Sequence, residues 1–230
     1  MVLIALLLAG CERNDPDIVR AEHYDSFWLW AGVTPSDALR RAQTVYLLDG
    51  ERLARGDGRY EPRRPGIPRL PATDVWLVVR TDTMDWPAGA VDDLSVRADR
   101  WAKGGSRMVG VQLDFDARIR HLDHYAAFLA NVRKRLPRRY RLSITGLMDW
   151  SANGDPKALA ALAGTLDEVV IQTYQGRSTI PGYERYFDRL RGFPIAFKVG
   201  LVEGGQWIEP AGLAANPKFK GYVVFLTAKR

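Results

Sequence analysis

Short runs rich in β-branched and aromatic residues alternate with segments of helical periodicity along most of this 230-residue chain. The predicted strands are residues 27–31, 44–48, 75–81, 109–115, 141–147, 168–174, 195–201 and 222–227. The predicted helices are residues 36–42, 91–103, 122–136, 156–166 and 182–191, with a short turn near Ala211. This alternation predicts an α/β fold with a parallel sheet, and eight such strands predict a closed (β/α)8 barrel of the TIM type. An open doubly wound sheet is the alternative.

One connection departs from the alternation. Residues 48–68, LDGERLARGDGRYEPRRPGIP, carry turn signals and no helical periodicity. We expect a hairpin or a long loop here in place of the second helix.

The predicted organisation is a signal segment over residues 1–10, a tether over 11–25 and a single barrel domain over 26–230.

The first residues form an apolar run, MVLIALLLAGC, that ends in Leu-Ala-Gly-Cys at Cys11. This ending resembles the lipobox of bacterial lipoproteins, in which the cysteine is lipidated and the preceding residues are removed. The resemblance implies a protein that a lipid on Cys11 anchors to a membrane of the bacterial cell envelope, facing the periplasm. A buried N-terminal strand or helix is the alternative. Cys11 is the only cysteine, so no intramolecular disulfide can form.

The formal net charge of +6 does not by itself identify a partner. Residues 133–141 hold six basic side chains, but they lie at the C-terminus of a predicted helix, where positive charge is favourable. We expect no nucleic acid partner for an envelope lipoprotein, and the sequence carries no signal of the oligomeric state. His121 and His124 lie near Asp114 and Asp116, yet no second ligand pair accompanies them, so we expect neither a metal site nor a cofactor.

Side chains alternate across a strand, which gives each predicted strand two faces. In residues 109–115, Val111 and Leu113 share one face, whereas Gln112, Asp114 and the following Asp116 share the other. The apolar sets must face the helices, so the polar sets face the barrel axis and converge on the mouth at the carboxyl ends of the strands. The converging residues are Arg80, Asp82, Gln112, Asp114, Asp116, Thr145, Asp149, Gln172, Tyr174 and Lys198. The alternative is a structural network in which Arg80 and Lys198 neutralise Asp114 and Asp116.

Four phrases, VQLDFDAR, LSITGLMDW, VVIQTYQGR and FKVGLVEGG, resemble an uncharacterised bacterial family known as a domain of unknown function. More distantly, residues 109–116 and 168–175 resemble the chitinase-like glycoside hydrolases of family eighteen, whose barrels carry the motifs DGxDxDxE and Met-x-Tyr-Asp. On that alignment Gly110 matches the motif glycine, Gln112 and Asp114 match its Asp-x-Asp pair, and Asp116 matches the proton-donating glutamate. Tyr174 matches the tyrosine that contacts the reacting N-acetyl group.

The resemblance implies a glycan-active barrel with three catalytic residues. Asp116 would be the acid, Asp114 its electrostatic partner and Tyr174 the group that orients the substrate. The sequence departs from the family in three ways: Asp116 is one methylene shorter than glutamate, Gln112 removes one acid, and the last strand lacks the family's tryptophan. A non-catalytic module that binds a polysaccharide or cell-wall fragment and an envelope scaffold are therefore the alternatives.

Tryptophans stand at or just after the ends of four predicted strands, at Trp30, Trp86, Trp150 and Trp207. Their rings could stack on sugar faces or fill the core. The predicted substrate-binding residues are Trp30, Arg80, Asp82, Gln112, Asp149, Trp150, Gln172, Lys198 and Trp207.

Overall fold

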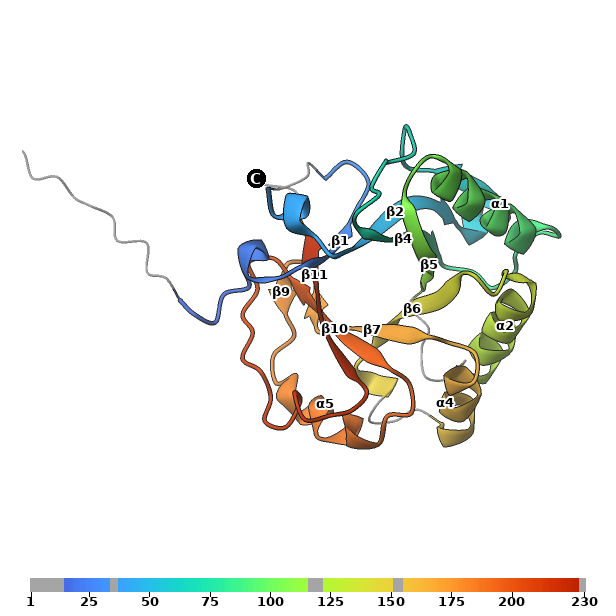
Figure 1. Ribbon diagram of the computed structural model, residues 1–230. Helices are drawn as coiled ribbons and strands as arrows, with labels where there is room; N and C mark the ends of the chain where they lie inside the picture. Colours follow the sequence, from blue (N-terminus) through green and yellow to red (C-terminus); the bar gives the residue numbers. More distant parts are fainter. Residues whose placement is uncertain (1–14, 34–36, 116–121, 151–154, 228–230) are drawn as a thin grey trace, which may run out of the picture.

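The computed structural model describes residues 15–33, 37–115, 122–150 and 155–227, and Figure 1 shows their arrangement. Eight parallel strands follow one another around a closed barrel, in which β1 pairs with both β2 and β11. They are β1 (Ser26–Leu29), β2 (Thr44–Arg52), β4 (Asp74–Thr81), β5 (Arg107–Asp114), β6 (Arg141–Leu147), β7 (Glu168–Gln172), β10 (Phe197–Val202) and β11 (Phe219–Leu226). The predicted (β/α)8 barrel is confirmed, and the open doubly wound alternative is wrong.

A hairpin takes the place of the second helix, as predicted. β3 (Tyr60–Pro62) runs antiparallel to the end of β2, and the 3-10 turn η3 (Ala54–Gly56) lies in the connection between them. β2 extends four residues beyond the predicted end at Leu48. It does so because Gly50–Arg52 pair with β3 on one side and with the end of β4 on the other.

Within the described residues, helices cover only part of the barrel. α1 (Ala90–Lys103), α2 (Leu122–Arg135) and α4 (Pro156–Ala163) line one side, on the right in Figure 1. The predicted 36–42 helix is the 3-10 helix η2 (Asp37–Arg41), and the predicted 182–191 helix is divided into α5 (Glu184–Phe187) and η5 (Arg189–Gly192). None of the helices in the described ranges is long and apolar enough to cross a membrane.

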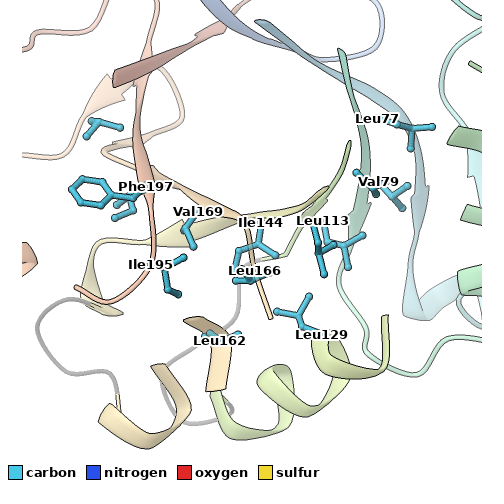
Figure 2. Close-up of a cluster of buried hydrophobic side chains, with 14 of the residues drawn as sticks. Leu77, Val79, Leu113, Leu129, Ile144, Leu162, Leu166, Val169, Ile195 and Phe197 are labelled. Atoms are coloured by element: carbon cyan, nitrogen blue, oxygen red, sulfur yellow. The ribbon is translucent and has the colours of Figure 1, made fainter. Parts of the chain in front are cut away.

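The outward faces of the strands form the larger core. Figure 2 shows Leu77, Val79, Leu113, Ile144, Val169 and Phe197 of the barrel wall above Leu129 of α2 and Leu162 of α4. Nearly all of this surface is removed from water, which is the main source of stability for such a layer. The predicted outward orientation of the apolar sets is confirmed.

The inside of the barrel is more apolar than we expected. Trp28, Tyr46, Trp76 and Phe225 all point inward, where Tyr46 stacks on Trp76 with ring centroids 5.6 Å apart and Trp28 stacks on Phe225 at 5.1 Å. A Cβ atom on Gly110 would lie 2.5 Å from the Trp76 ring, so a glycine in β5 makes room for this stack. These rings fill the barrel, because eight strands leave an interior just wide enough for side chains.

Residues 15–25, within the predicted tether, lie against the barrel. Val19 donates its N–H to the Gly205 carbonyl at 2.8 Å, and Trp207 donates its N–H to the Asp17 carbonyl at 2.7 Å. The short η1 (Ala21–His23) follows, and Val19 and Ala21 are buried. This segment therefore packs against the loop after β10, on a side of the barrel away from α1, α2 and α4 (Figure 1).

Candidate functional site

A cavity of about 580 Å³ opens at the carboxyl ends of the barrel strands. We call it the mouth. Its walls come from five of the barrel strands or the residues that follow them, and from a small hairpin after β7. The lining residues are Trp30, Arg80, Thr81, Asp82, Asp114, Phe115, Leu147, Gln172, Tyr174, Gln175, Gly176 and Ile180. This is the end of the barrel at which the fold places its sites.

Asp114 is the buried carboxylate of the mouth. It is the last residue of β5, only 6% of its surface is exposed, and its Oδ1 accepts a hydrogen bond from Thr145 Oγ1 of β6 at 2.7 Å. The alternation of side chains along the two strands predicted that Asp114 and Thr145 both face the inside of the barrel, and they do.

Trp30 and Arg80 form the side of the mouth next to β1 and β4. The Arg80 guanidinium lies 5.5 Å from the Trp30 ring, and its Nη1 is 4.0 Å from Glu51 Oε1. Asp82 lies at the rim, where it accepts a hydrogen bond from the Ala54 N–H at 2.7 Å. Trp30 is half-buried and Arg80 is exposed, so a ligand can reach both.

A hairpin of β8 (Tyr174–Gln175) and β9 (Ser178–Thr179) forms the opposite side of the mouth. Thr173 fixes its base, because its N–H and its Oγ1 both donate to the Gly200 carbonyl, at 3.1 and 2.9 Å. Tyr174 follows, with its ring 4.9 Å from that of Phe225. Sequence analysis missed this hairpin, although Gly176, with a φ of 61°, is a turn signal within the phrase QTYQGRST.

Gln112 is not accessible to a ligand, which corrects its predicted role in binding. Its side chain is fully buried one layer below Asp114, where Oε1 accepts from Trp28 Nε1 at 2.8 Å and Nε2 donates to Ser143 Oγ at 3.0 Å. Both ends of the amide are thus engaged within the barrel. Where the chitinase-like motif has a carboxylate, this chain has a neutral structural group.

Lys198 also requires a correction. It is the second residue of β10, so it lies at the amino end of the barrel, in a separate pocket with Arg141 and Glu168. Its Nζ is 5.7 Å from the Tyr46 ring. Lys198 therefore does not neutralise the carboxylates of the mouth, and the part of the alternative network that depended on it is wrong.

Three of the four predicted tryptophans belong to the outer packing. Trp150 is 2% exposed and contacts Tyr125 of α2, whereas Trp207 is stacked on Tyr183 with ring centroids 4.6 Å apart. Trp86 packs edge-on against Phe128 of α2, with centroids 5.2 Å apart. Trp150 and Trp207 are thus buried outside the mouth.

Asp149 is exposed and lies outside the lining of the mouth. Asp116 and Cys11 lie outside the described residues, as does His121. Across the described ranges, no group of three or more His, Cys, Asp or Glu side chains is placed to hold a metal ion.

Comparison with known proteins gives a family and a fold. The profile of a family described as Domain of unknown function (DUF3142) matches residues 77–192, which include strands β5 to β7 and the β8–β9 hairpin. A search of the curated proteins finds no match.

Several solved structures share the fold at low sequence identity. The spore cortex-lytic enzyme SleL of Bacillus cereus is 16% identical with a TM-score of 0.51, over 77% of this chain and 49% of that one. The chitinase domain of the spore coat protein CotE of Clostridium difficile is 14% identical with a TM-score of 0.54, over 83% and 67%. The tamarind chitinase-like lectin is 12% identical with a TM-score of 0.53, over 88% and 94%. This chain spans about half the length of SleL, and its predicted resemblance to chitinase-like barrels is confirmed for the fold.

Proposed function

Because the chain belongs to the family described as Domain of unknown function (DUF3142), we propose its function from the mouth itself: the barrel binds a glycan there. The observation that carries the proposal is a cavity in which the Trp30 ring and the buried Asp114 carboxylate share one lining. Sugar rings present apolar faces that stack on aromatic side chains and hydroxyl groups that donate to carboxylates. Arg80, Asp82 and Gln172 add polar contacts around them.

The neighbours of this fold support a carbohydrate ligand. Their names describe a spore cortex-lytic enzyme, a chitinase domain and a chitinase-like lectin. One scaffold thus carries both lytic and lectin proteins. That pairing fits the two versions of the proposal, binding with hydrolysis and binding alone.

Hydrolysis is the second candidate, and the placement of Asp114 favours it. In this version Asp116 donates a proton to the leaving glycosidic oxygen, Asp114 tunes that acid, and Tyr174 orients the substrate, whose acetamido oxygen attacks the anomeric carbon. Thr145 holds Asp114 at the end of β5, two residues before Asp116. Binding alone is favoured by Gln112, since a neutral amide replaces the carboxylate beneath Asp114.

The test uses the full chain carrying Cys11→Ser, so that no lipid is attached. Calorimetry against N-acetylated and neutral oligosaccharides measures binding, and chromatography of the same mixtures measures cleavage. We expect Trp30→Ala to weaken binding about tenfold or more, as loss of a stacking ring removes on the order of 1.4 kcal/mol. Trp86→Ala is the matched control, because it removes the same ring from outside the mouth.

Substitution of the two carboxylates distinguishes hydrolysis from binding alone. If the protein is a hydrolase, Asp114→Asn and Asp116→Asn each reduce product release while binding persists. If wild-type protein binds without releasing product, the mouth is a binding site only. Absence of binding to every oligosaccharide, with the protein folded, would refute a glycan ligand.

We also propose that a lipid on Cys11 holds this barrel at the bacterial cell envelope, facing the periplasm. The support is the Leu-Ala-Gly-Cys sequence that ends an apolar run. A glycan-binding barrel tethered there would have cell-wall polymers within reach.

A further inference from the structure

A second cavity, of about 370 Å³, lies outside the barrel wall between residues 62–67 and α1. We call it the arginine pocket. It exists because the β2–β3 hairpin and the segment after it replace a packed helix. Its lining residues are Asp49, Pro62, Arg64, Pro65, Gly66, Ile67, Arg97, Arg100 and Trp101.

Arg64 is held in this pocket with hydrogen-bonding capacity to spare. Its Nε donates to the Leu48 carbonyl at 2.9 Å, whereas its Nη2 is shielded from solvent and has no hydrogen-bond partner among the described residues. Burial lowers the pKa of Arg64, although an arginine remains protonated in proteins. A buried donor without an acceptor is unfavourable, so Arg64 gains a hydrogen bond if its guanidinium turns toward an oxygen of a ligand in the pocket.

The charges in the pocket do not balance. Among the described residues, Asp49 is the one carboxylate that lines the pocket. It accepts a hydrogen bond from the Tyr60 hydroxyl and lies 3.4 Å from Arg97 Nη1. Arg97 is thus paired. Within the described residues, Arg64 and Arg100 have no carboxylate within 4.0 Å, so three guanidinium groups and one carboxylate leave two positive charges in the pocket.

We propose that the arginine pocket binds a phosphate monoester. Guanidinium groups match the oxygens of such an anion in geometry, and a dianion matches the two unbalanced charges, whereas a carboxylate would neutralise only one. Pro62, Pro65 and Ile67 provide an apolar wall for the carbon part of the ester, and Ile67 is 44% exposed. This proposal goes beyond glycan binding at the mouth and does not depend on it.

Calorimetry at low ionic strength tests the proposal, with the full Cys11→Ser chain titrated with inorganic phosphate. Arg100 is exposed, so Arg100→Gln should leave the fold intact while lowering the affinity for phosphate about tenfold or more. Arg64→Gln should do the same. Arg138→Gln is the control, because Arg138 is an exposed arginine outside the pocket.

Further ligands identify the source of the phosphate. Tighter binding of glucose 6-phosphate supports a sugar phosphate, and tighter binding of a short-chain phosphatidic acid below its micelle concentration supports a lipid headgroup. Affinity for acetate equal to that for phosphate would overturn the assignment of a dianion. Phosphate binding that is absent, or that Arg100→Gln and Arg64→Gln leave unchanged, would overturn the site.

Discussion

Two side chains of β5 that share one face have opposite environments. Asp114 lines the open mouth, whereas Gln112, two residues earlier and about 7 Å deeper, is enclosed between Trp28 and Ser143. The amide suits this depth because it offers an acceptor to the indole and a donor to the hydroxyl. The same alternation that exposes one residue therefore buries the other.

We expect Gln112→Leu to lower the free energy of unfolding by about 1–3 kcal/mol, because the buried Trp28 N–H loses its acceptor. Urea denaturation measures the change. The exposed glutamine Gln43 supplies the control, since Gln43→Leu disturbs no buried contact. Equal stability of the Gln112→Leu and wild-type proteins would contradict this role.

Residue parity could be predicted from the sequence, but depth could not. The alternation placed Arg80, Asp114 and Gln172 correctly at the mouth. The alternation could not predict that Lys198 lies at the amino end of the barrel. The height of a side chain along the barrel axis depends on where its strand begins, and β10 begins at Phe197. Nor could the alternation show that Trp30 lines the mouth whereas Trp207 packs outside it. Both residues follow strands, and the packing of the loop that holds each ring determines its environment.

At the scale of elements, the β2–β3 hairpin is the most distinctive part of this barrel. Gly50 is its close-packed point: a Cβ atom there would overlap the Tyr60 ring and lie 2.6 Å from the Glu61 carbonyl oxygen. The turn signals of residues 48–68 predicted a hairpin or loop. The arginine pocket beside this hairpin could not be predicted, because the pocket depends on how residues 62–67 lie against α1.

We expect Gly50→Ala to destabilise the protein by about 1–3 kcal/mol through overpacking, and to weaken phosphate binding because Asp49 and Arg64 adjoin the displaced strand. Thermal unfolding and calorimetry measure the two effects. Gly192→Ala is the comparison, because a Cβ atom there meets nothing within 4 Å. A Gly50→Ala protein as stable as Gly192→Ala would refute the close packing.

Two arginines of the basic run 133–141 form hydrogen bonds within the fold. Arg133 donates to the carbonyls of Leu136 and Tyr140 at 2.9 Å, so it closes the end of α2. Arg139 donates to Asp99 of α1 at 2.7 Å. The prediction that this run serves a helix C-terminus is confirmed for Arg133.

The contact of α1 with Arg139 and Tyr140 gives a pH dependence. Hydrogen bonds from Arg139 and then Tyr140 lower the pKa of Asp99 below its ordinary value of 3.8. A lowered pKa in the folded state means that the contact stabilises the protein above pH 3.8, and that this stabilisation is lost as the pH falls through the lowered value.

Asp99→Asn should therefore be less stable than wild type near neutral pH, by no more than about 1 kcal/mol because the contact is partly exposed. The difference should shrink as the pH falls below 3.8. Urea denaturation across a pH series measures it, with the exposed Asp85→Asn as control. A difference that stays constant with pH would show that ionisation of Asp99 is not involved.

At the scale of the whole molecule, the closed barrel separates two chemistries. The mouth draws on inward-facing side chains and on the loops at the carboxyl ends, whereas the arginine pocket draws on the hairpin and on α1 outside the wall. Closure could be predicted from eight strands in a chain of this length. The filling of its interior by Trp28, Tyr46, Trp76 and Phe225 could not, since alternation assigns a side chain to the inner face but does not show which rings stack on one another there.

The anchor is the remaining prediction for the whole molecule. If Cys11 is lipidated, the full chain expressed in a bacterium should sediment with membranes and incorporate labelled palmitate. Cys11→Ser should abolish the label and release the protein, and the result is unambiguous because the chain has no other cysteine. Cys11→Ala provides a second test of the thiol. Label that persists in either variant would refute the lipobox interpretation, and it would leave glycan binding at the mouth and phosphate binding outside the wall to stand on their own tests.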